Sequence, residues 1–268
     1  MSEVVCEIVS PPGIGEKRRA EMFALMQALY EAVDREAFGH DLDAKDFVIL
    51  VQNEGAVVGF TTGAVRQTEI DGRTIRYMYS GDTLVHPEFW GSGHFLPVWS
   101  QLMGNIKAAV PSLPLYWFLI TKGHRTYRLL TNFFRSYVPR ASGDNDPALM
   151  RVRDAVAGEK FGSFYDPATG LIDFGTSRGH LAPALLDASE LATNNRAVRD
   201  FLTLNPEHGR GVELACIAEL AEANMRHFAA TRFGEGLREG LAVTQADSGS
   251  PFWEPYPGLY EAARRDVA

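Results

Sequence analysis

The chain has 268 residues, 46% of them hydrophobic, which is enough for one large domain or for a catalytic domain with an extension. Its formal net charge of −8 argues against a nucleic-acid-binding protein, because affinity for a polyanion depends mainly on Lys and Arg. Two cysteines without a C-x-x-C pair, and no visible signal peptide or apolar run of ~20 residues, favour a cytoplasmic protein without disulfides or membrane contact.

The first part of the chain is predicted to form a strand and two helices. Residues 4–9 have the composition of a short edge strand, which Pro11-Pro12-Gly13 ends. Apolar side chains recur every three or four positions over residues 16–33, as in a helix with one buried stripe. Residues 37–42 predict one or two further helical turns.

Two β-hairpins are predicted next. Apolar residues 47–51 and 56–60 flank the turn Asn53-Glu54-Gly55, whose residues tolerate positive φ. The second hairpin turns at Ile70-Asp71-Gly72-Arg73 and leads into residues 74–79.

Residues 79–96 carry the most informative pattern, in which a strand-like run passes directly into a glycine-rich turn and a helix. Glycines in the turn allow backbone N–H groups to approach an anion, and the positive end of the helix dipole points the same way. The pattern therefore predicts a site for a phosphate-bearing cofactor, although it matches neither G-x-G-x-x-G nor G-x-x-x-x-G-K-[ST]. The residues expected to bind the cofactor here are Val85, Gly91, Ser92, Gly93 and His94.

A crossover unit is predicted around this turn. The helix covers about residues 94–110, and the continuous apolar run 115–120 predicts a central strand covered on both faces. A strand, a helix and a second strand at this spacing place the ends of the two strands on the same side of the sheet.

The order Val85-x-Pro87-Glu88 followed by Gly91-x-Gly93 resembles the acyl-CoA-binding motif Q/R-x-x-G-x-G/A of the GNAT acyltransferase superfamily. The resemblance covers about residues 47–134 and departs from the motif at Glu88, where a carboxylate should repel phosphate. It implies an α/β fold with a mixed, mostly antiparallel central sheet flanked by helices. Two central strands of this fold splay apart around the pantetheine arm of acyl-CoA, with acetyl-CoA as the expected co-substrate.

The resemblance also implies a general acid. Tyr127 occupies the position of the tyrosine that often protonates the departing thiolate in this family, and a phenol suits that task because its pKa of ~10 is near that of an alkyl thiol. The closing Gly-Phe pair of the family is replaced by Asn132-Phe133 or Phe133-Phe134. The alternative is that Tyr127 only packs beside Leu130.

A general base is needed because only a neutral amine attacks the thioester carbonyl. Asp82 is the first candidate, since it lies in an apolar strand where burial would raise the pKa of its carboxyl group. His86 is the second, because its ordinary pKa of ~6.5 suits base catalysis, although a histidine before Pro87 at a strand end is commonly solvated. No H-x-x-x-H pair with a nearby acid occurs, so no metal is expected.

Lys122, Arg125 and Arg128 form a basic run in this acidic chain. Such a run is either a solvated helix face or a phosphate contact that supplies the positive charge missing at Glu88. Lys122 and Arg125 are accordingly expected to bind the cofactor. In this second case the donor is acyl-CoA, an acyl carrier protein with its single phosphopantetheine, or an aminoacyl-tRNA, and all three stay open.

The second half of the chain is expected to extend this core. Helices are predicted near residues 148–156 and 194–204, and a late strand at 211–218. The expected regions are an acyltransferase core at 1–140, an extension at 141–233 that completes the sheet and covers the acceptor side, and a poorly ordered tail at 234–268.

The sequence thus predicts an acyltransferase that moves an acyl group from a thioester donor to the amine of a small molecule. The competing interpretation is a non-catalytic GNAT-like binding module. Glu88 and the missing Gly-Phe pair favour the module, whereas Tyr127 and Gly91-x-Gly93 favour the enzyme. The acceptor, the acyl group and the oligomeric state are left open.

Overall fold

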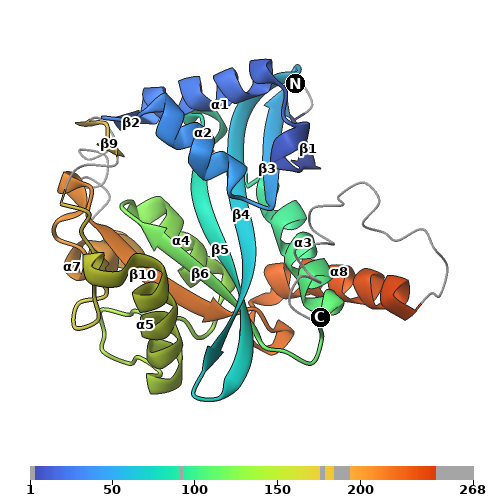
Figure 1. Cartoon of the computed structure of the whole chain (residues 1–268), viewed down its shortest axis with the longest axis vertical. Helices are drawn as coiled ribbons and strands as arrows, with labels where there is room; N and C mark the ends of the chain where they lie inside the picture. The colour runs from blue at the N-terminus through green and yellow to red at the C-terminus, as the bar shows by residue number, and fades with distance from the viewer. Residues whose placement is uncertain (1–3, 91–92, 176–178, 184–193, 246–268) are drawn as a thin grey trace.

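The computed structural model describes residues 4–90, 93–175, 179–183 and 194–245. Its main sheet has eight strands in the order β1-β3-β4-β5-β6-β10-β8-β7, all antiparallel neighbours except the parallel pair β5 and β6 (Figure 1). The strands are β1 Val4–Val9, β3 Phe47–Asn53, β4 Ala56–Ile70, β5 Arg73–Val85, β6 Leu115–Thr121, β7 Tyr165–Asp166, β8 Leu171–Ile172 and β10 Glu213–Glu219. The predicted mixed, mostly antiparallel sheet is confirmed.

Helices cover both faces of this sheet. They are α1 Glu16–Leu29, α2 Arg35–Asp43, α3 Phe95–Ala109, α4 His124–Phe133, α5 Pro147–Phe161, α7 Arg196–Leu204 and α8 His227–Gln245. Alternate residues of β3 point to opposite faces, so Phe47 packs with α3, α4 and α8 while Val48 packs with α1 and α2. Phe118 of β6 packs against α5 on the same face as α1 and α2. Both hairpins, the crossover helix and the central strand are therefore confirmed.

The parallel strands β5 and β6 pair over only part of their length. Their register extends from Arg76 opposite Leu115 to Ser80 opposite Leu119. Beyond Ser80, a β-bulge sets Gly81 and Asp82 of β5 against the single residue Thr62 of β4. The two central strands thus separate from Gly81 onward, where the bulge begins, and such a separation is what the GNAT resemblance implies.

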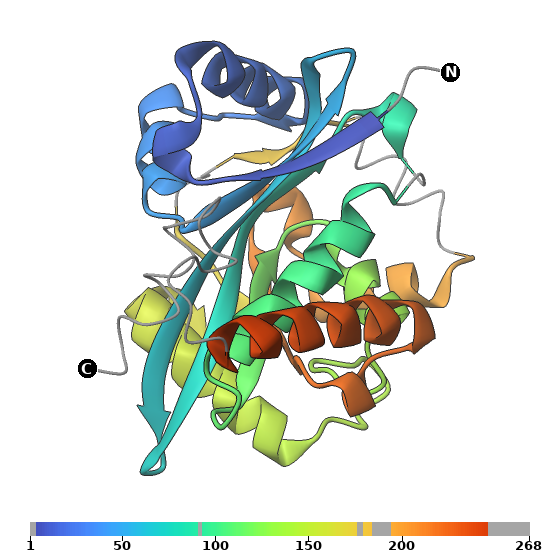
Figure 2. The ribbon, with the colours of Figure 1, turned by 90° about the vertical axis from the view of Figure 1, so that its right-hand side faces the viewer.

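Helix α8 corrects the predicted tail. Residues 234–245 are helical and lie along α3 (Figure 2), whereas residues 246–268 lie outside the described part of the chain. The helices approach so closely that a Cβ on Gly236 would lie 1.9 Å from the Gln101 carbonyl oxygen, and one on Gly104 would lie 2.1 Å from that of Phe233. Gly236 and Gly104, which lack a Cβ, therefore permit tight packing of α8 against α3.

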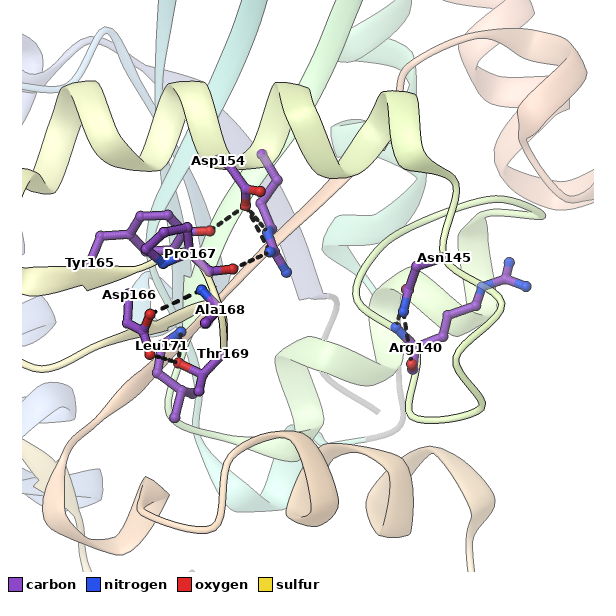
Figure 3. A network of polar contacts seen from close by, with 10 residues as sticks. Arg140, Asn145, Asp154, Tyr165, Asp166, Pro167, Ala168, Thr169 and Leu171 are labelled. Carbon is purple, nitrogen blue, oxygen red and sulfur yellow. Dashed lines mark hydrogen bonds and ion pairs between the residues drawn. The ribbon is translucent and has the colours of Figure 1, made fainter.

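Strand β10, from the second half of the chain, pairs antiparallel with β6. Helix α5 is joined to the β7–β8 turn by Asp154, whose carboxylate accepts hydrogen bonds from the Tyr165 hydroxyl and from the fully buried Arg153 guanidinium (Figure 3). Gly170, with φ of +76°, allows the turn to pass against Arg153. A second, two-stranded sheet joins β2 (Tyr30–Glu31) to β9 (His180–Leu181). No helix of the described residues is long and apolar enough to cross a membrane.

Candidate functional site

Two cavities meet where β5 and β6 separate. One, of about 460 Å³, lies between α1, α2 and α5, and we call it the α1–α5 cavity. The other, of about 430 Å³, lies between the N-terminal ends of α3 and α4, and we call it the α3–α4 cavity. Tyr30, Thr83 and Thr126 line both. A ligand in either cavity therefore reaches the same junction.

The α3–α4 cavity contains most of the predicted cofactor-binding residues. Val85, Gly93, His94 and Arg125 line it. Gly93 has φ of +63°, a backbone conformation that glycine adopts without strain, and it leads into α3. The N-terminal ends of α3 and α4 both face this space, so their unpaired N–H groups favour an anion. Gly91 and Ser92 lie outside the described residues.

Two arginines add positive charge to the α3–α4 cavity. The Arg125 guanidinium stacks 3.8 Å from the centre of the Trp90 ring, and Arg128 lines the same wall. Burial, followed by the charges of Arg125 and Arg128, lowers the pKa of His124 from 6.5 to about 4. His124 is consequently neutral at pH 7, and the positive charge of this cavity comes from the two guanidinium groups.

Glu88 and His86 lie outside both cavities. The Glu88 side chain is 80% exposed and its carboxylate lies 3.7 Å from the His86 ring. The His86 Nδ1 atom accepts a hydrogen bond from the Glu88 N–H. The Glu88 carboxylate therefore faces solvent, where it does not repel a phosphate bound in the α3–α4 cavity. The structure does not bring His86 together with Asp82.

Asp82 lines the α1–α5 cavity at the bulge of β5. Its carboxylate makes no hydrogen bond or ion pair with the described residues. Burial is the main cause that raises its pKa from 3.8 to about 6, and Asp41 adds to the rise while Lys45 and Lys122 oppose it. Beside it, a Cβ on Gly81 would lie 2.5 Å from Lys45 Cε, so a larger residue there would displace the Lys45 side chain. Asp82 has the placement expected of a general base.

Other acids of the α1–α5 cavity are already paired. The Lys122 ammonium lies 3.3 Å from the Glu213 carboxylate and donates to the Gly179 carbonyl oxygen at 2.9 Å. Asp41 is paired with the buried Lys45. Lys122 therefore lies in this cavity and not in the α3–α4 cavity, which argues against its predicted contact with the cofactor.

Tyr127 lies in the core, on α4. Its side chain is fully buried, its hydroxyl donates to the Pro139 carbonyl oxygen at 2.9 Å, and its ring packs against Tyr137 and Phe201. It lines neither cavity, and burial raises its pKa. This placement corrects the predicted general acid, because a hydroxyl committed to a core carbonyl cannot reach a thiolate at the junction.

Tyr30 is the tyrosine at the junction, and sequence reasoning missed it. Its hydroxyl makes no hydrogen bond with the described residues, and its ring faces the Lys122 ammonium at 5.7 Å. Burial and the charges of Asp82 and Glu213 raise its pKa. The predicted helix 16–33 includes Tyr30, but α1 ends at Leu29 and Tyr30 pairs with β9. No local pattern signals this long-range pairing.

Aromatic side chains from the extension form one wall of the α1–α5 cavity. The ring centres of Phe161 and Phe174 are 5.9 Å apart, and those of Phe164 and Phe174 are 5.4 Å apart. The Lys160 ammonium lies 4.2 Å from the centre of the Tyr79 ring. This cavity therefore combines an aromatic wall with the Asp82 carboxylate, which is unpaired among the residues that the structure describes. Within the described ranges, no three His, Cys, Asp or Glu side chains are grouped as a metal site would require.

A scan of protein-family models gives no match, and neither does a search of curated proteins. Similar solved structures include a probable N-acyltransferase from Enterococcus faecalis, with 14% identity over 50% of this chain and 33% of that chain and a TM-score of 0.38. A GNAT family N-acetyltransferase from Escherichia coli in complex with CoA has 13% identity over 50% and 69%, with a TM-score of 0.34. An IAA acetyltransferase from Bacillus cereus has 14% identity over 50% and 80%, with a TM-score of 0.32.

The mixed, mostly antiparallel sheet and the two central strands that separate are features that the GNAT resemblance implies. So is the turn that leads from β5 into α3. The described part of the chain therefore has a mixed α/β fold with a mostly antiparallel central sheet flanked by helices.

Proposed function

We propose that the protein transfers an acyl group from acyl-CoA, of which acetyl-CoA is the simplest, to the amine of a small molecule. The observation that carries this proposal is the meeting of two cavities at Tyr30, Thr83 and Thr126. A reaction between two bound substrates needs both reacting groups at one point, and this junction supplies that point.

The α3–α4 cavity suits the donor. Its helix N-termini and the guanidinium groups of Arg125 and Arg128 favour the phosphates of CoA. With the phosphates held there, the pantetheine arm extends along Val85 toward Thr83, where the two strands have separated. The thioester then lies at the junction.

The α1–α5 cavity suits the acceptor. Asp82 takes a proton from the ammonium group, and the neutral nitrogen attacks the thioester carbonyl carbon. The N–C bond forms, the nitrogen gives up its second proton to water, and the C–S bond breaks. The departing thiolate takes the proton of the Tyr30 hydroxyl, which solvent then restores, and Asp82 releases its proton to solvent. The raised pKa of Tyr30 keeps this hydroxyl protonated at neutral pH.

The aromatic wall favours an acceptor with an apolar group beside its amine. Phe161, Phe164 and Phe174 offer apolar surface opposite the charged side of the cavity. All three belong to the region after residue 141, so the extension contributes to the choice of acceptor.

The test is release of free CoA from acetyl-CoA in the presence of a panel of primary amines with aryl, alkyl or no apolar groups. We expect turnover that is fastest with the apolar amines and is lost in Asp82→Asn. The matched control is Glu69→Gln, an exposed acid outside both cavities.

Three other results would contradict parts of the proposal. CoA binding without turnover of any amine would favour the non-catalytic module. Turnover only with an acyl carrier protein or an aminoacyl-tRNA would replace acyl-CoA as the donor. Normal CoA affinity in a folded Gly93→Val variant would remove the assignment of the donor cavity.

A further inference from the structure

A third cavity, of about 630 Å³, lies on the other side of α4. Arg135, Arg140, Arg196 and Arg226 line it, and we call it the arginine cavity. Among the described residues, two acids, at positions 144 and 200, line it. An excess of positive charge in one hollow of a chain with net charge −8 requires an explanation.

Three of these guanidinium groups are oriented by carbonyl oxygens. Arg135 Nε donates to Met225 at 3.2 Å, and Arg226 Nε donates to Thr131 at 3.0 Å. Arg140 donates from its terminal nitrogen to the carbonyl of Arg135. Among the described residues none of the three has a carboxylate partner. A carbonyl fixes the direction of a guanidinium group without cancelling its charge, so N–H groups stay available in a fixed fork.

Several contacts fix the position of Arg140. The Asn145 side chain accepts from its N–H at 2.7 Å and donates to its carbonyl oxygen at 3.2 Å, and in Figure 3 the Arg140 side chain extends away from this contact. Its guanidinium stacks 4.5 Å from the centre of the Tyr137 ring. The Nε atom of Arg140 is buried without a hydrogen-bond partner in the described part of the chain. The Tyr137 ring and the carbonyl of Arg135 therefore fix the direction of this guanidinium group.

We propose that the arginine cavity binds a phosphate-bearing small molecule through the guanidinium groups of Arg135, Arg140 and Arg226. Phosphate oxygens accept the paired N–H groups that a guanidinium presents, and fixed side chains lose little freedom on binding. The volume of about 630 Å³ suits one small molecule. The acidic character of the whole chain disfavours a long polyanion, which would have to extend beyond the cavity.

This site is separate from the donor cavity. Thr131 lines the arginine cavity, whereas Arg128 and Asn132 of the same helix line the α3–α4 cavity. No arginine of one cavity lines the other. Removal of one binding activity should therefore leave the other intact.

The experiment measures the affinities of pyrophosphate and of CoA by calorimetry for the wild type and for variants of each cavity. Arg226→Gln and Arg140→Gln should weaken pyrophosphate binding at least about tenfold, because each removes a charge-assisted contact. Both should leave CoA affinity within about twofold, while Arg125→Gln should weaken CoA binding much more than pyrophosphate binding. Arg232→Gln, which removes a surface ion pair with Glu235, is the matched control and should change neither.

Several results would overturn the proposal. The proposal is wrong if the wild type does not bind pyrophosphate, or if Arg226→Gln binds pyrophosphate as tightly as the wild type does. An equal loss of CoA affinity in Arg226→Gln would show that the cavity is part of the donor site. Tighter binding of a single-stranded RNA oligonucleotide, lost in Arg226→Gln, would assign the surface to a polyanion. If Arg140→Gln does not fold, Arg226→Gln decides alone. Failure of CoA to bind, with pyrophosphate binding intact, would reject the proposed function and leave this inference standing.

Discussion

Asp82→Asn is expected to make the protein more stable at pH 7 and to abolish its activity. The wild-type carboxylate is partly buried without a partner, so its charged form is disfavoured in the folded state. An asparagine of nearly the same shape carries no charge at any pH. The substitution therefore removes an electrostatic cost that only a functional role would justify.

The magnitude follows from the pKa values. The pKa of Asp82 is about 6 in the folded protein and 3.8 in its ordinary state. At pH 7 the group is ionised in both states, and a difference of ~2 pKa units corresponds to ~3 kcal/mol against folding. Because the folded state holds the proton more tightly, this cost falls as the pH decreases from about 6 and is absent below about 3.8.

The assay is chemical unfolding of wild type and Asp82→Asn at pH 7, 6, 5 and 4. We expect the variant to be more stable by ~2–3 kcal/mol at pH 7 and the difference to vanish near pH 4. Glu69→Gln controls for removal of an exposed carboxylate. A difference below ~1 kcal/mol at pH 7, or one that does not change with pH, would refute the argument from buried charge. In the wild type, turnover should fall as the pH decreases through about 6, because the protonated acid is no base.

Tyr30→Phe should lower kcat ~10²- to 10⁴-fold with little change in CoA affinity, because the variant lacks the proposed general acid. Tyr127→Phe should leave kcat within about threefold and lower the free energy of unfolding by ~1 kcal/mol, because it loses one hydrogen bond. Steady-state kinetics and urea unfolding distinguish the two variants. A loss of turnover in Tyr127→Phe but not in Tyr30→Phe would show that Tyr127 is the general acid after all. Gly236→Val should lower the free energy of unfolding by ~2 kcal/mol or more, because its Cβ would clash with α3. The control Gly39→Ala, whose Cβ would meet open space, should leave this free energy unchanged or raise it slightly. Equal unfolding midpoints of the two variants would contradict the packing argument. Glu88→Gln should change the Kd of CoA, measured by calorimetry, by less than about threefold, because the Glu88 carboxylate points to solvent. A much lower Kd in this variant would show that the Glu88 carboxylate faces the phosphates of CoA.

The local sequence determined the order of elements and the faces of the central strands. Residues 79–96 specified a strand, a glycine turn and a helix, because glycine conformations and apolar periods act over a few residues. The same kind of signal predicted both hairpins and the late strand β10. The candidate base Asp82 was found this way too, since a lone acid in an apolar strand is visible in the sequence.

Tertiary structure alone decided which polar side chains meet at the junction. Tyr30 arrives there through pairing with β9, about 150 positions later, and Tyr127 of α4 points into the core. Helix α8 is ordered by contact with α3, which Gly236 and Gly104 permit. Local patterns specify a helix or a strand, but the direction of one hydroxyl or carboxylate depends on segments that are far apart in the chain and adjacent only after folding.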